Sequence, residues 1–398
     1  MRALVIAPQP FFSPRGTPYS VYYRTLVTSE LGVEVDLLTY GEGEDVDIPG
    51  VRIYRIPRFG AFGNVKTGPS LLKLFLDGFI LARAVALLCR TRYAFVHAHE
   101  ESVFFCRFLK PLFGFKLVYD MHSSLPEQLR NFKFTESRVL IRAFEWLENT
   151  SLRASDAIIT ICPALADYVH RTLGDTPRHL LIENSIFDPV KVEGRNGGSP
   201  VGPGDSSAGT SLETKIPNGR DLVVYAGTLE TYQGIDLLIA AFAKVLGSHP
   251  SAFLLVVGGT AEQVARYSAL AKEHGVADHC RFTGRVPQAL ARRYTSMASV
   301  LVSPRSAGIN TPLKVYEQLA SGVPLVATRI YSHTQVLDDD VAFLVEPHAN
   351  DMAEGMLQAL TSGSERERRG TNAKGRYERD YSRPAYVAKM RRLMDLLR

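Results

Sequence analysis

Cysteine and tryptophan are scarce in this chain of 398 residues, which contains four cysteines and one tryptophan. No Cys-x-x-Cys pair occurs, and no histidine stands at metal-ligand spacing from a cysteine, so neither a disulfide framework nor a structural zinc site is indicated. The composition therefore excludes a small secreted protein held together by disulfides. The four cysteines are Cys89, Cys106, Cys162 and Cys280.

Long hydrophobic runs are also missing. No stretch of eighteen or more uncharged apolar residues occurs, so no membrane-spanning helix is predicted. The apolar run at residues 3–7 is too short for a signal peptide, and we interpret it as the first strand of a domain. We therefore expect a protein of the cytoplasmic side.

The net charge of +5 is mild but unevenly distributed. Between Arg52 and Lys116 there are eleven lysines and arginines against three acids, Asp77, Glu100 and Glu101. A local excess of one sign indicates a polyanionic partner. The basic residues of this region are Arg52, Arg55, Arg58, Lys66, Lys73, Arg83, Arg90, Arg92, Arg107, Lys110 and Lys116.

Short apolar runs alternate with helix-length segments along both halves of the chain, which is typical of doubly wound, mostly parallel sheets. A chain of this length accommodates two such domains, so we predict an α/β protein with two Rossmann-like domains. The first-half strands are predicted at residues 3–7, 33–39, 51–56, 95–98, 116–120, 157–161 and 180–183. The second-half strands are predicted at residues 222–226, 253–258, 280–283, 300–303, 323–328 and 342–345.

A segment rich in Gly, Ser and Pro separates the two halves and has almost no large apolar residue before Leu212. Such a segment cannot bury enough surface to order itself. We predict an N-terminal domain at residues 1–190, a flexible linker at 191–220, a second domain at 221–375 and a C-terminal helix at 376–398.

The most informative stretch follows the predicted strand that starts at Val300. A helix is expected to begin at Thr311-Pro312 and to stop at Gly322, because Pro in the first turn and Gly past the last are the usual helix boundaries. A helix that begins at the carboxyl end of a parallel strand directs free backbone N–H groups and the positive end of its dipole towards a ligand. This pattern predicts an anion site.

Two charged residues accompany that helix start. Lys314 is in the first turn, and Glu317 lies about one and a half turns in, where a carboxylate reaches the sugar of a nucleotide bound by its phosphates. An ordinary α/β connection with a solvated Lys and Glu is the alternative interpretation.

The run Pro-x-x-x-Gly, then Thr-Pro-Leu-Lys-x-x-Glu-x-x-Ala-x-Gly-x-Pro-x-Val-Ala-Thr, at residues 304–328, resembles the donor-site segment of the retaining family-4 glycosyltransferases. The resemblance implies the GT-B fold, with two Rossmann-like domains facing a cleft and a last helix that crosses back to the first domain. It implies sugar transfer from a nucleotide diphosphate sugar to an acceptor hydroxyl with retention, without a bound metal or other cofactor. Glu317 matches the glutamate that holds the ribose, whereas the family's other glutamate is replaced by Ile309.

The resemblance also implies roles for the remaining site residues. The family has Arg and Lys in the loop that opens the second domain, where this chain has Thr228 and Gln233, and we expect Arg305 and Lys314 to neutralise the donor diphosphate in their place. In the family, a histidine at a strand end faces the donor sugar and its phosphate, and His122 matches it. Arg305, Lys314 and His122 are therefore the predicted catalytic residues. The other residues predicted to bind the donor are Gly16, Thr17, Gly227, Thr228, Gln233, Gly258, Arg285, Val286, Asn310, Thr311, Pro312 and Leu313. Gly16 and Thr17 are expected in a ligand-facing loop at residues 11–18, which precedes a helix predicted at residues 19–31.

Other ionisable residues are interpreted as structural or as marking a helix start. His97 and His99 alternate on one side of a predicted strand and are interpreted as structural. Adjacent carboxylates such as Glu100 and Glu101 more often mark a helix start than a catalytic pair, and no metal site is assigned.

The acceptor is predicted from the basic, aromatic region at residues 59–116. Its apolar segment, residues 71–88, is too charged to span a bilayer and is interpreted first as a buried helix. The basic and phenylalanine residues around it suit an anionic membrane surface, so we expect a peripheral enzyme of the cytoplasmic leaflet. Its acceptor would be a lipid, a lipid-linked molecule or another cell-envelope acceptor, with a soluble acceptor as the alternative. Its donor would be a UDP-sugar, with a GDP-sugar second.

Two alternatives remain. A non-catalytic protein that binds nucleotide sugars would explain the departures at Ile309, Thr228 and Gln233. A nicotinamide dehydrogenase is disfavoured, because no Gly-x-Gly-x-x-Gly follows the first strand. No nucleic-acid partner is expected.

Overall fold

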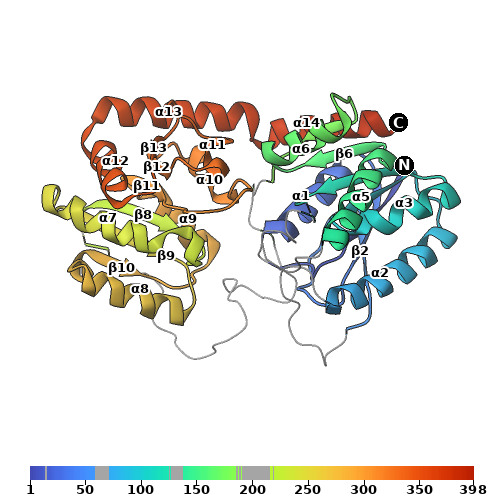
Figure 1. Ribbon diagram of the computed structural model, residues 1–398, viewed down its shortest axis with the longest axis horizontal. Helices are drawn as coiled ribbons and strands as arrows, with labels where there is room; N and C mark the ends of the chain where they lie inside the picture. Colours follow the sequence, from blue (N-terminus) through green and yellow to red (C-terminus); the bar gives the residue numbers. More distant parts are fainter. Residues whose placement is uncertain are drawn as a thin grey trace. The chain divides into compact units, whose positions relative to one another are not determined.

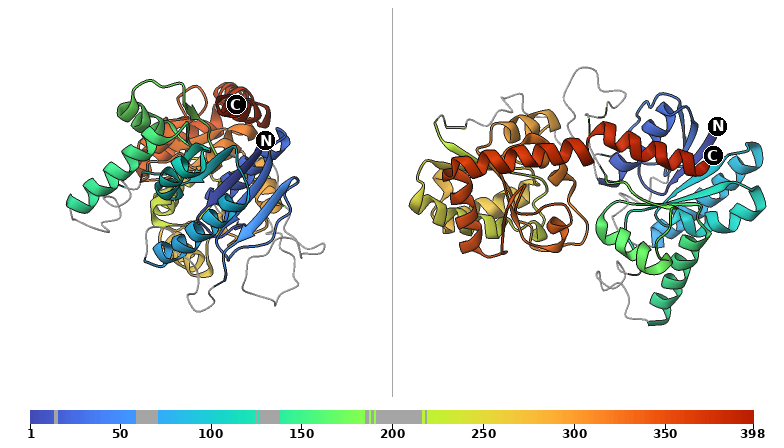
Figure 2. Two further views of the ribbon diagram at one scale, coloured as in Figure 1. Left: turned by 90° about the vertical axis from the view of Figure 1, so that its right-hand side faces the viewer. Right: turned by 90° about the horizontal axis from the view of Figure 1, so that it is seen from above.

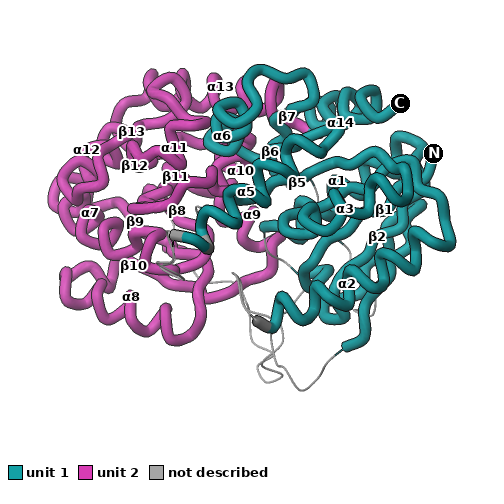
Figure 3. The backbone as a smooth tube through the Cα atoms, turned by 45° about the vertical axis from the view of Figure 1, so that its right-hand side comes forward, with its two compact units in different colours: residues 1–194, 383–398 teal, residues 195–382 magenta. Residues whose placement is uncertain are grey.

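The computed structural model divides by its internal contacts into two compact units, coloured separately in Figure 3. Unit 1 comprises residues 1–194 and 383–398, and unit 2 comprises residues 195–382. Most of the predicted linker lies outside the described residues. The structure describes residues 1–13, 16–58, 71–124, 126, 138–184, 187, 190, 216–217 and 219–398.

Unit 1 is built on a seven-stranded sheet in which every pairing is parallel, with the order β3-β2-β1-β4-β5-β6-β7. Its strands are β1 (Arg2–Ala7), β2 (Glu34–Thr39), β3 (Val51–Arg55), β4 (Phe95–His99), β5 (Lys116–Met121), β6 (Ala157–Thr160) and β7 (His179–Leu181). Its helices are α1 (Gly16–Glu30), α2 (Leu71–Arg90), α3 (Ser102–Phe113), α5 (Arg138–Ala154), α6 (Pro163–Leu173) and α14 (Arg383–Leu397).

Both faces of this sheet are covered because the strand side chains alternate between them. Leu4 and Ile6 of β1 point into a core with α2, α3, α5 and α6. Ala3 and Val5 point into the opposite core, with α1 and α14. Helix α14 therefore completes one face of unit 1, and Figures 1 and 2 mark the two chain ends close together there.

Unit 2 repeats the plan with a six-stranded parallel sheet of order β10-β9-β8-β11-β12-β13. Val223 and Tyr225 face a core formed with α7 and α12, whereas Leu222 and Val224 face a core formed with α9 and α10. Its strands are β8 (Asp221–Ala226), β9 (Ala252–Val257), β10 (Cys280–Phe282), β11 (Val300–Ser303), β12 (Leu325–Thr328) and β13 (Phe343–Val345). Its helices are η2 (Thr231–Gln233), α7 (Ile235–Ser248), α8 (Ala261–Glu273), η3 (Ala277–His279), α9 (Gln288–Ser296), α10 (Leu313–Ser321), α11 (Tyr331–Thr334), α12 (Ala349–Thr361) and α13 (Gly363–Asp380).

The predicted two-domain α/β fold is confirmed, and each of the thirteen predicted strands is present. Two predicted boundaries were wrong. Helix α1 begins at Gly16 and not at Tyr19. Residues 376–382 belong to unit 2, because α13 ends at Asp380 and only the residues from Arg383 onward join unit 1. No helix of the described chain is long and apolar enough to cross a membrane.

Candidate donor site and a buried histidine cluster

The start of α10 forms the predicted anion site of unit 2. The helix follows the loop after β11, begins at Leu313 with Pro312 as its N-cap, and ends at Gly322 in the left-handed conformation. The N–H groups of Leu313 and Lys314 precede the hydrogen-bond ladder of the helix and face the carboxyl end of the parallel sheet, whereas the N–H of Val315 donates to the carbonyl of Pro312 at 3.0 Å. The hydroxyl of Thr311 is buried without a hydrogen-bond partner among the described residues. These polar groups suit an anionic ligand.

Lys314 brings a cation to this site. Its Nζ donates to Oε1 of Gln233 at 3.2 Å and lies 4.1 Å from the centre of the Tyr225 ring. Burial, helped by the nearby charge of Arg305, lowers the pKa of Lys314 to about 7. A Cβ at Gly227 would lie 3.7 Å from the same Nζ. The ammonium of Lys314 thus adjoins Gln233, the position where the resembling family has a lysine.

Arg305, the second predicted cation, is engaged with its own loop. Its Nε donates to the carbonyl of Ala307 at 2.6 Å, one Nη donates to the carbonyl of Asn310 at 3.4 Å, and the guanidinium lies 5.1 Å from the Tyr232 ring centre. Burial lowers its pKa, but an arginine side chain stays charged in proteins. Arg305 therefore shapes the loop before α10 as well as adding positive charge to it.

Glu317 lies in the middle of α10, and its side chain is 39% exposed. Nη2 of Arg292, on α9, donates to its Oε1 at 3.3 Å. Burial raises the pKa of the Glu317 carboxyl, and the charge of Arg292 opposes that shift. The second carboxylate oxygen is a suitable acceptor for ribose hydroxyls. The sequence analysis did not identify Arg292, because its position on a separate helix carries no motif.

The other predicted donor residues of unit 2 differ in exposure. Thr228 is exposed, and its carbonyl accepts from the Tyr225 hydroxyl at 2.6 Å. Arg285 is also exposed, whereas Val286 is partly buried against the core. Gly258, at φ +117°, is required by close packing, because a Cβ there would lie 2.0 Å from the carbonyl oxygen of Gly227.

A buried network that the sequence analysis missed fixes the ends of β11 and β12. His333 lies 2.9 Å from the Ser303 hydroxyl through Nε2 and 2.8 Å from the Thr328 carbonyl through Nδ1. The Thr328 hydroxyl donates to the carbonyl of Arg305. Burial lowers the pKa of His333 to about 4, so the ring is neutral near pH 7. The network orients the loop that leads to α10.

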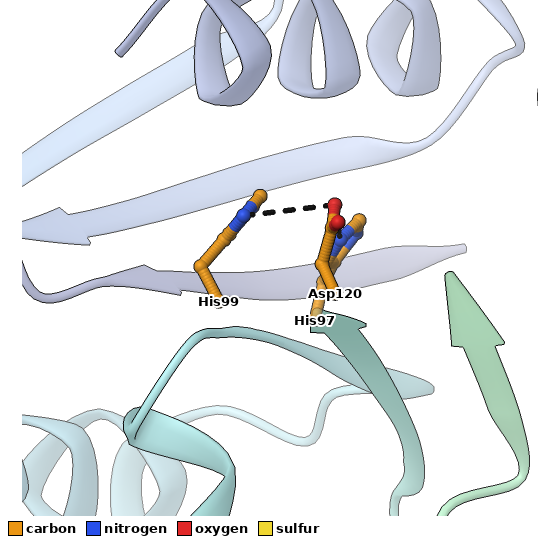
Figure 4. A group of neighbouring side chains, drawn as sticks. All are labelled: His97, His99 and Asp120. Atoms are coloured by element: carbon orange, nitrogen blue, oxygen red, sulfur yellow. Dashed lines mark hydrogen bonds and ion pairs between the residues drawn. The ribbon is translucent and has the colours of Figure 1, made fainter. Parts of the chain in front are cut away.

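Unit 1 contains a buried cluster at the ends of β4 and β5. Nε of Arg24 donates to Oδ2 of Asp120 at 2.8 Å, and Nε2 of His97 lies 3.0 Å from the same oxygen. His99 Nδ1 lies 3.1 Å from His122 Nε2 and 3.6 Å from Asp120 Oδ2. Figure 4 shows the two strand histidines converging on Asp120.

The charged pair of this cluster consists of the Asp120 carboxylate and the Arg24 guanidinium. Although burial opposes ionisation, Arg24 and the histidines hold the pKa of Asp120 well below its usual range. Burial lowers the pKa of His122 to about 4 and that of His99 well below its ordinary value. Both rings are therefore neutral near pH 7, and His122 is only 4% exposed. A neutral imidazole of this kind can exchange hydrogen bonds with a sugar hydroxyl.

His97, His99 and Asp120 stand close enough to hold a metal ion, with candidate ligand atoms within 4.8 Å of one another. The Arg24 guanidinium, however, already binds the Asp120 oxygen that faces His97. A cation at that distance opposes a second, divalent one. We therefore interpret the cluster as an ion pair with supporting histidines, and the His97 and His99 rings are stacked with centres 4.6 Å apart.

The two donor-binding residues predicted near the N-terminus lie in a helix and not in a loop. Gly16 and Thr17, expected in a ligand loop, are the first two residues of α1. Helix α1 also carries Arg24, which the sequence analysis missed together with Asp120. An ionisable residue inside a buried parallel strand, such as Asp120, is an available signal, because such positions are otherwise apolar.

Comparison with known proteins identifies the class. The model of the glycosyl transferase 4-like domain matches residues 23–185, and that of the glycosyl transferases group 1 matches residues 211–376. Among solved structures, sucrose-phosphate synthase from Thermosynechococcus elongatus superposes with a TM-score of 0.73 at 21% identity, covering 100% of this chain and 98% of that one. Anabaena Alr3699/HepE in complex with UDP-glucose superposes with a TM-score of 0.67 at 14% identity, covering 100% and 99%.

Curated relatives agree. The D-inositol 3-phosphate glycosyltransferase of Acidothermus cellulolyticus is 32% identical over 346 residues, which are 80% of this chain and 71% of the relative. The phosphatidyl-myo-inositol mannosyltransferase of Mycolicibacterium smegmatis is 29% identical over 171 residues, which are 43% of this chain and 39% of the relative. The chain belongs to the family-4 glycosyltransferases of the GT-B fold, as its donor-site segment predicted.

Proposed function

We propose that the protein transfers a hexose from a UDP-sugar to a hydroxyl group of a lipid-linked acceptor, with retention of configuration and without a metal ion. A GDP-sugar is the second choice of donor. The observation that carries this proposal is the ammonium of Lys314 beside Gln233, at the start of α10. This arrangement returns a cation to a donor site whose family cations are replaced by Thr228 and Gln233.

The chemistry follows from the charge that develops on the leaving group. Cleavage of the glycosyl bond leaves a nucleoside diphosphate, and preorganised donors and cations at its oxygens lower the barrier. The backbone N–H groups of Leu313 and Lys314, the Thr311 hydroxyl and the Lys314 ammonium are such groups. Glu317 would hold the ribose hydroxyls and so orient the nucleotide. His122, neutral near pH 7, would bind a hydroxyl of the transferred sugar.

Retention is proposed from the family resemblance. A leaving-group phosphate oxygen beside the acceptor hydroxyl takes its proton, so that substitution on the same face needs no protein nucleophile. The choice of uridine is supported by Alr3699/HepE, whose structure was solved with UDP-glucose. The choice of a lipid-linked acceptor is supported by the phosphatidyl-myo-inositol mannosyltransferase, and the inositol phosphate relative makes a soluble polyol phosphate the competing acceptor.

Nucleotide binding tests the donor site. Thermal shift and calorimetry with UDP, GDP, ADP and their sugars rank the donors, since a ligand at about 100 times its dissociation constant stabilises by roughly 2.7 kcal/mol. Glu317→Ala should weaken nucleoside diphosphate binding by about 2–4 kcal/mol, the scale for losing charge-assisted hydrogen bonds. Glu354→Ala, at an exposed position of α12, is the matched control. Unchanged affinity in Glu317→Ala contradicts the assignment.

A non-catalytic nucleotide-sugar-binding protein is the second candidate, favoured by Ile309, Thr228 and Gln233 in place of family residues. Release of UDP from the preferred UDP-sugar separates the two. Turnover with or without an added acceptor supports the enzyme. Tight binding with no release of UDP in the presence of inositol phosphate and phosphatidylinositol acceptors supports the binding protein.

A further inference from the structure

Exposed apolar side chains are concentrated on one side of unit 1. Six of the large hydrophobic residues that are exposed in the described chain lie on α2, α3 and α5, whereas those of unit 2 are scattered over separate loops and helices. We name these six the apolar face. They are Leu74 (69% exposed), Phe75 (46%), Phe108 (59%), Leu112 (75%), Val139 (80%) and Trp146 (61%).

The three helices lie next to one another on the same side of the sheet. Their inward side chains share one core, and α3 contacts both α2 and α5. Phe108 and Leu112 are four residues apart on α3, and Val139 and Trp146 are seven apart on α5, so each pair lies on one face of its helix. The guanidinium of Arg107 links the two helices, with the Phe108 ring centre at 4.3 Å and the Trp146 ring centre at 4.9 Å.

Helix α5 is unusual because none of the described side chains of its first half belongs to the buried core. Leu152, near its end, is its one fully buried large apolar side chain among those described. Figure 2 shows the first turns of α5 extending beyond the neighbouring helices. Large exposed apolar surface on a soluble protein often marks a binding site.

The most exposed charges of these helices are positive. Among the described side chains of α2, α3 and α5, the charged ones that are exposed are all arginines, whereas the acids are partly or fully buried. Arg142 and Arg153 lie on the same face of α5 as Trp146, four residues before it and seven after. The exposed arginines are Arg83, Arg90, Arg142 and Arg153.

Two lysines expected from the sequence to meet a membrane are engaged elsewhere. Lys73 pairs with Glu101, and Lys110 pairs with Asp156 at 2.7 Å and donates to the carbonyl of Ala154. The arginines near Trp146 therefore replace them as the cations available to a membrane. Phe59, Phe62 and Lys66, also part of that expectation, lie outside the described residues.

We infer that the apolar face of α2, α3 and α5 inserts into the headgroup region of an anionic membrane. Tryptophan and phenylalanine favour that region, and the arginines beside them attract anionic headgroups. A lipid occupant is favoured over a protein partner by this combination of exposed aromatic side chains with exposed arginines, since none of the described acids on these helices is exposed. The inference agrees with the proposed lipid-linked acceptor, but its test needs neither donor nor turnover.

Trp146 is the only tryptophan of the chain and therefore reports on this surface directly. Vesicles of phosphatidylcholine with phosphatidylglycerol should shift its emission to the blue at low salt, and brominated lipids should quench it. Vesicles of phosphatidylcholine alone should give a much weaker response, because electrostatic attraction to the headgroups is missing. An unchanged emission with anionic vesicles at low salt overturns the inference.

Co-sedimentation with the same vesicles tests the individual residues of the full chain. The double variant Phe108→Ser, Leu112→Ser should lower the partition coefficient on the order of tenfold or more, since it removes two apolar side chains from the membrane. The matched control is Met297→Ser with Tyr331→Ser, two exposed residues of unit 2. Arg142→Glu with Arg153→Glu should reduce binding to anionic vesicles only. Equal binding by the first variant and the control contradicts the inference.

Two further measurements distinguish a membrane surface from misfolding and from self-association. Near-parental unfolding midpoints and UDP binding show that a variant is folded, so loss of vesicle binding alone identifies the surface. Analytical ultracentrifugation tests a second copy of the chain as the occupant. If Trp146 emission shifts with protein concentration in the absence of vesicles, together with dimer formation, the face is a protein interface and the membrane inference is wrong.

Discussion

The ammonium of Lys314 lies 3.2 Å from Oε1 of Gln233, although the two residues are 81 positions apart and come from different elements. The position of Gln233 carries a lysine in the resembling family. In this chain the positive charge comes instead from the first turn of α10, and the glutamine accepts a hydrogen bond from it. The ammonium of Lys314 thus lies beside the position of the family's lysine, although it comes from another part of the sequence.

The role of Lys314 as the replacement cation can be tested by moving the positive charge to position 233. Lys314→Met should lower the rate at saturating donor by about 100-fold or more, the scale for removing one group that stabilises a developing anion. Adding Gln233→Lys to that variant should restore much of the rate, because the new ammonium starts from the neighbouring position. Lys272→Met, at an exposed position of α8, is the control. Steady-state kinetics with unchanged turnover in Lys314→Met would falsify the assignment.

Nucleotide affinity should depend on pH through the same group. Since the pKa of Lys314 is about 7, the ammonium is charged below that pH and progressively lost above it. A bound diphosphate stabilises the charged form, so the dissociation constant of UDP should rise as pH increases from 7, by at most about tenfold per pH unit. Calorimetry between pH 7 and 9 measures this slope. Lys314→Met should flatten it, and an equal slope in both proteins refutes the role.

Acidification should destabilise both units through buried neutral histidines. His122 and His333 have folded-state pKa values near 4, below the ordinary value of 6.5, so the unfolded chain binds protons that the folded chain does not. Stability is therefore complete above pH 6.5 and falls as pH drops towards 4, by up to about 3 kcal/mol for each histidine. Urea unfolding at pH 7, 5.5 and 4.5 measures the loss. His333→Gln should reduce the pH dependence for unit 2, while a slope identical to the parent's contradicts this role of the histidine.

Removing one partner of the Arg24–Asp120 pair should strongly lower the free energy of unfolding. Arg24→Leu leaves the Asp120 carboxylate buried without its guanidinium and should lower the free energy of unfolding by about 3–5 kcal/mol. Combining it with Asp120→Leu should recover a large part of the loss, because both charges are then removed. Arg52→Leu, at an exposed site of β3, is the control. Chemical denaturation showing additive losses in the double variant would argue against a coupled pair.

The strands could be predicted because fully buried parallel strands are continuous apolar runs. The start of α14 was missed although Pro384, its second residue, is a typical helix-start signal. The α10 segment was predictable because its groups are neighbours in sequence. Contacts such as Arg24–Asp120 and Lys314–Gln233 were not, since the pairing of residues 96 and 81 positions apart is set by tertiary packing.

Helix α14 has a consequence for how unit 1 is completed during synthesis. Its Tyr386 hydroxyl accepts from Arg24 at 2.8 Å, and Met390 and Leu393 fill the core against β1 and α1. These residues leave the ribosome roughly 190 positions after the rest of unit 1, a delay of about 10 to 40 s at ordinary rates of translation. Until then α1 alone among the described helices packs on this face of the seven-stranded sheet, and the apolar side chains that α14 will cover stay exposed while the second unit is still being made.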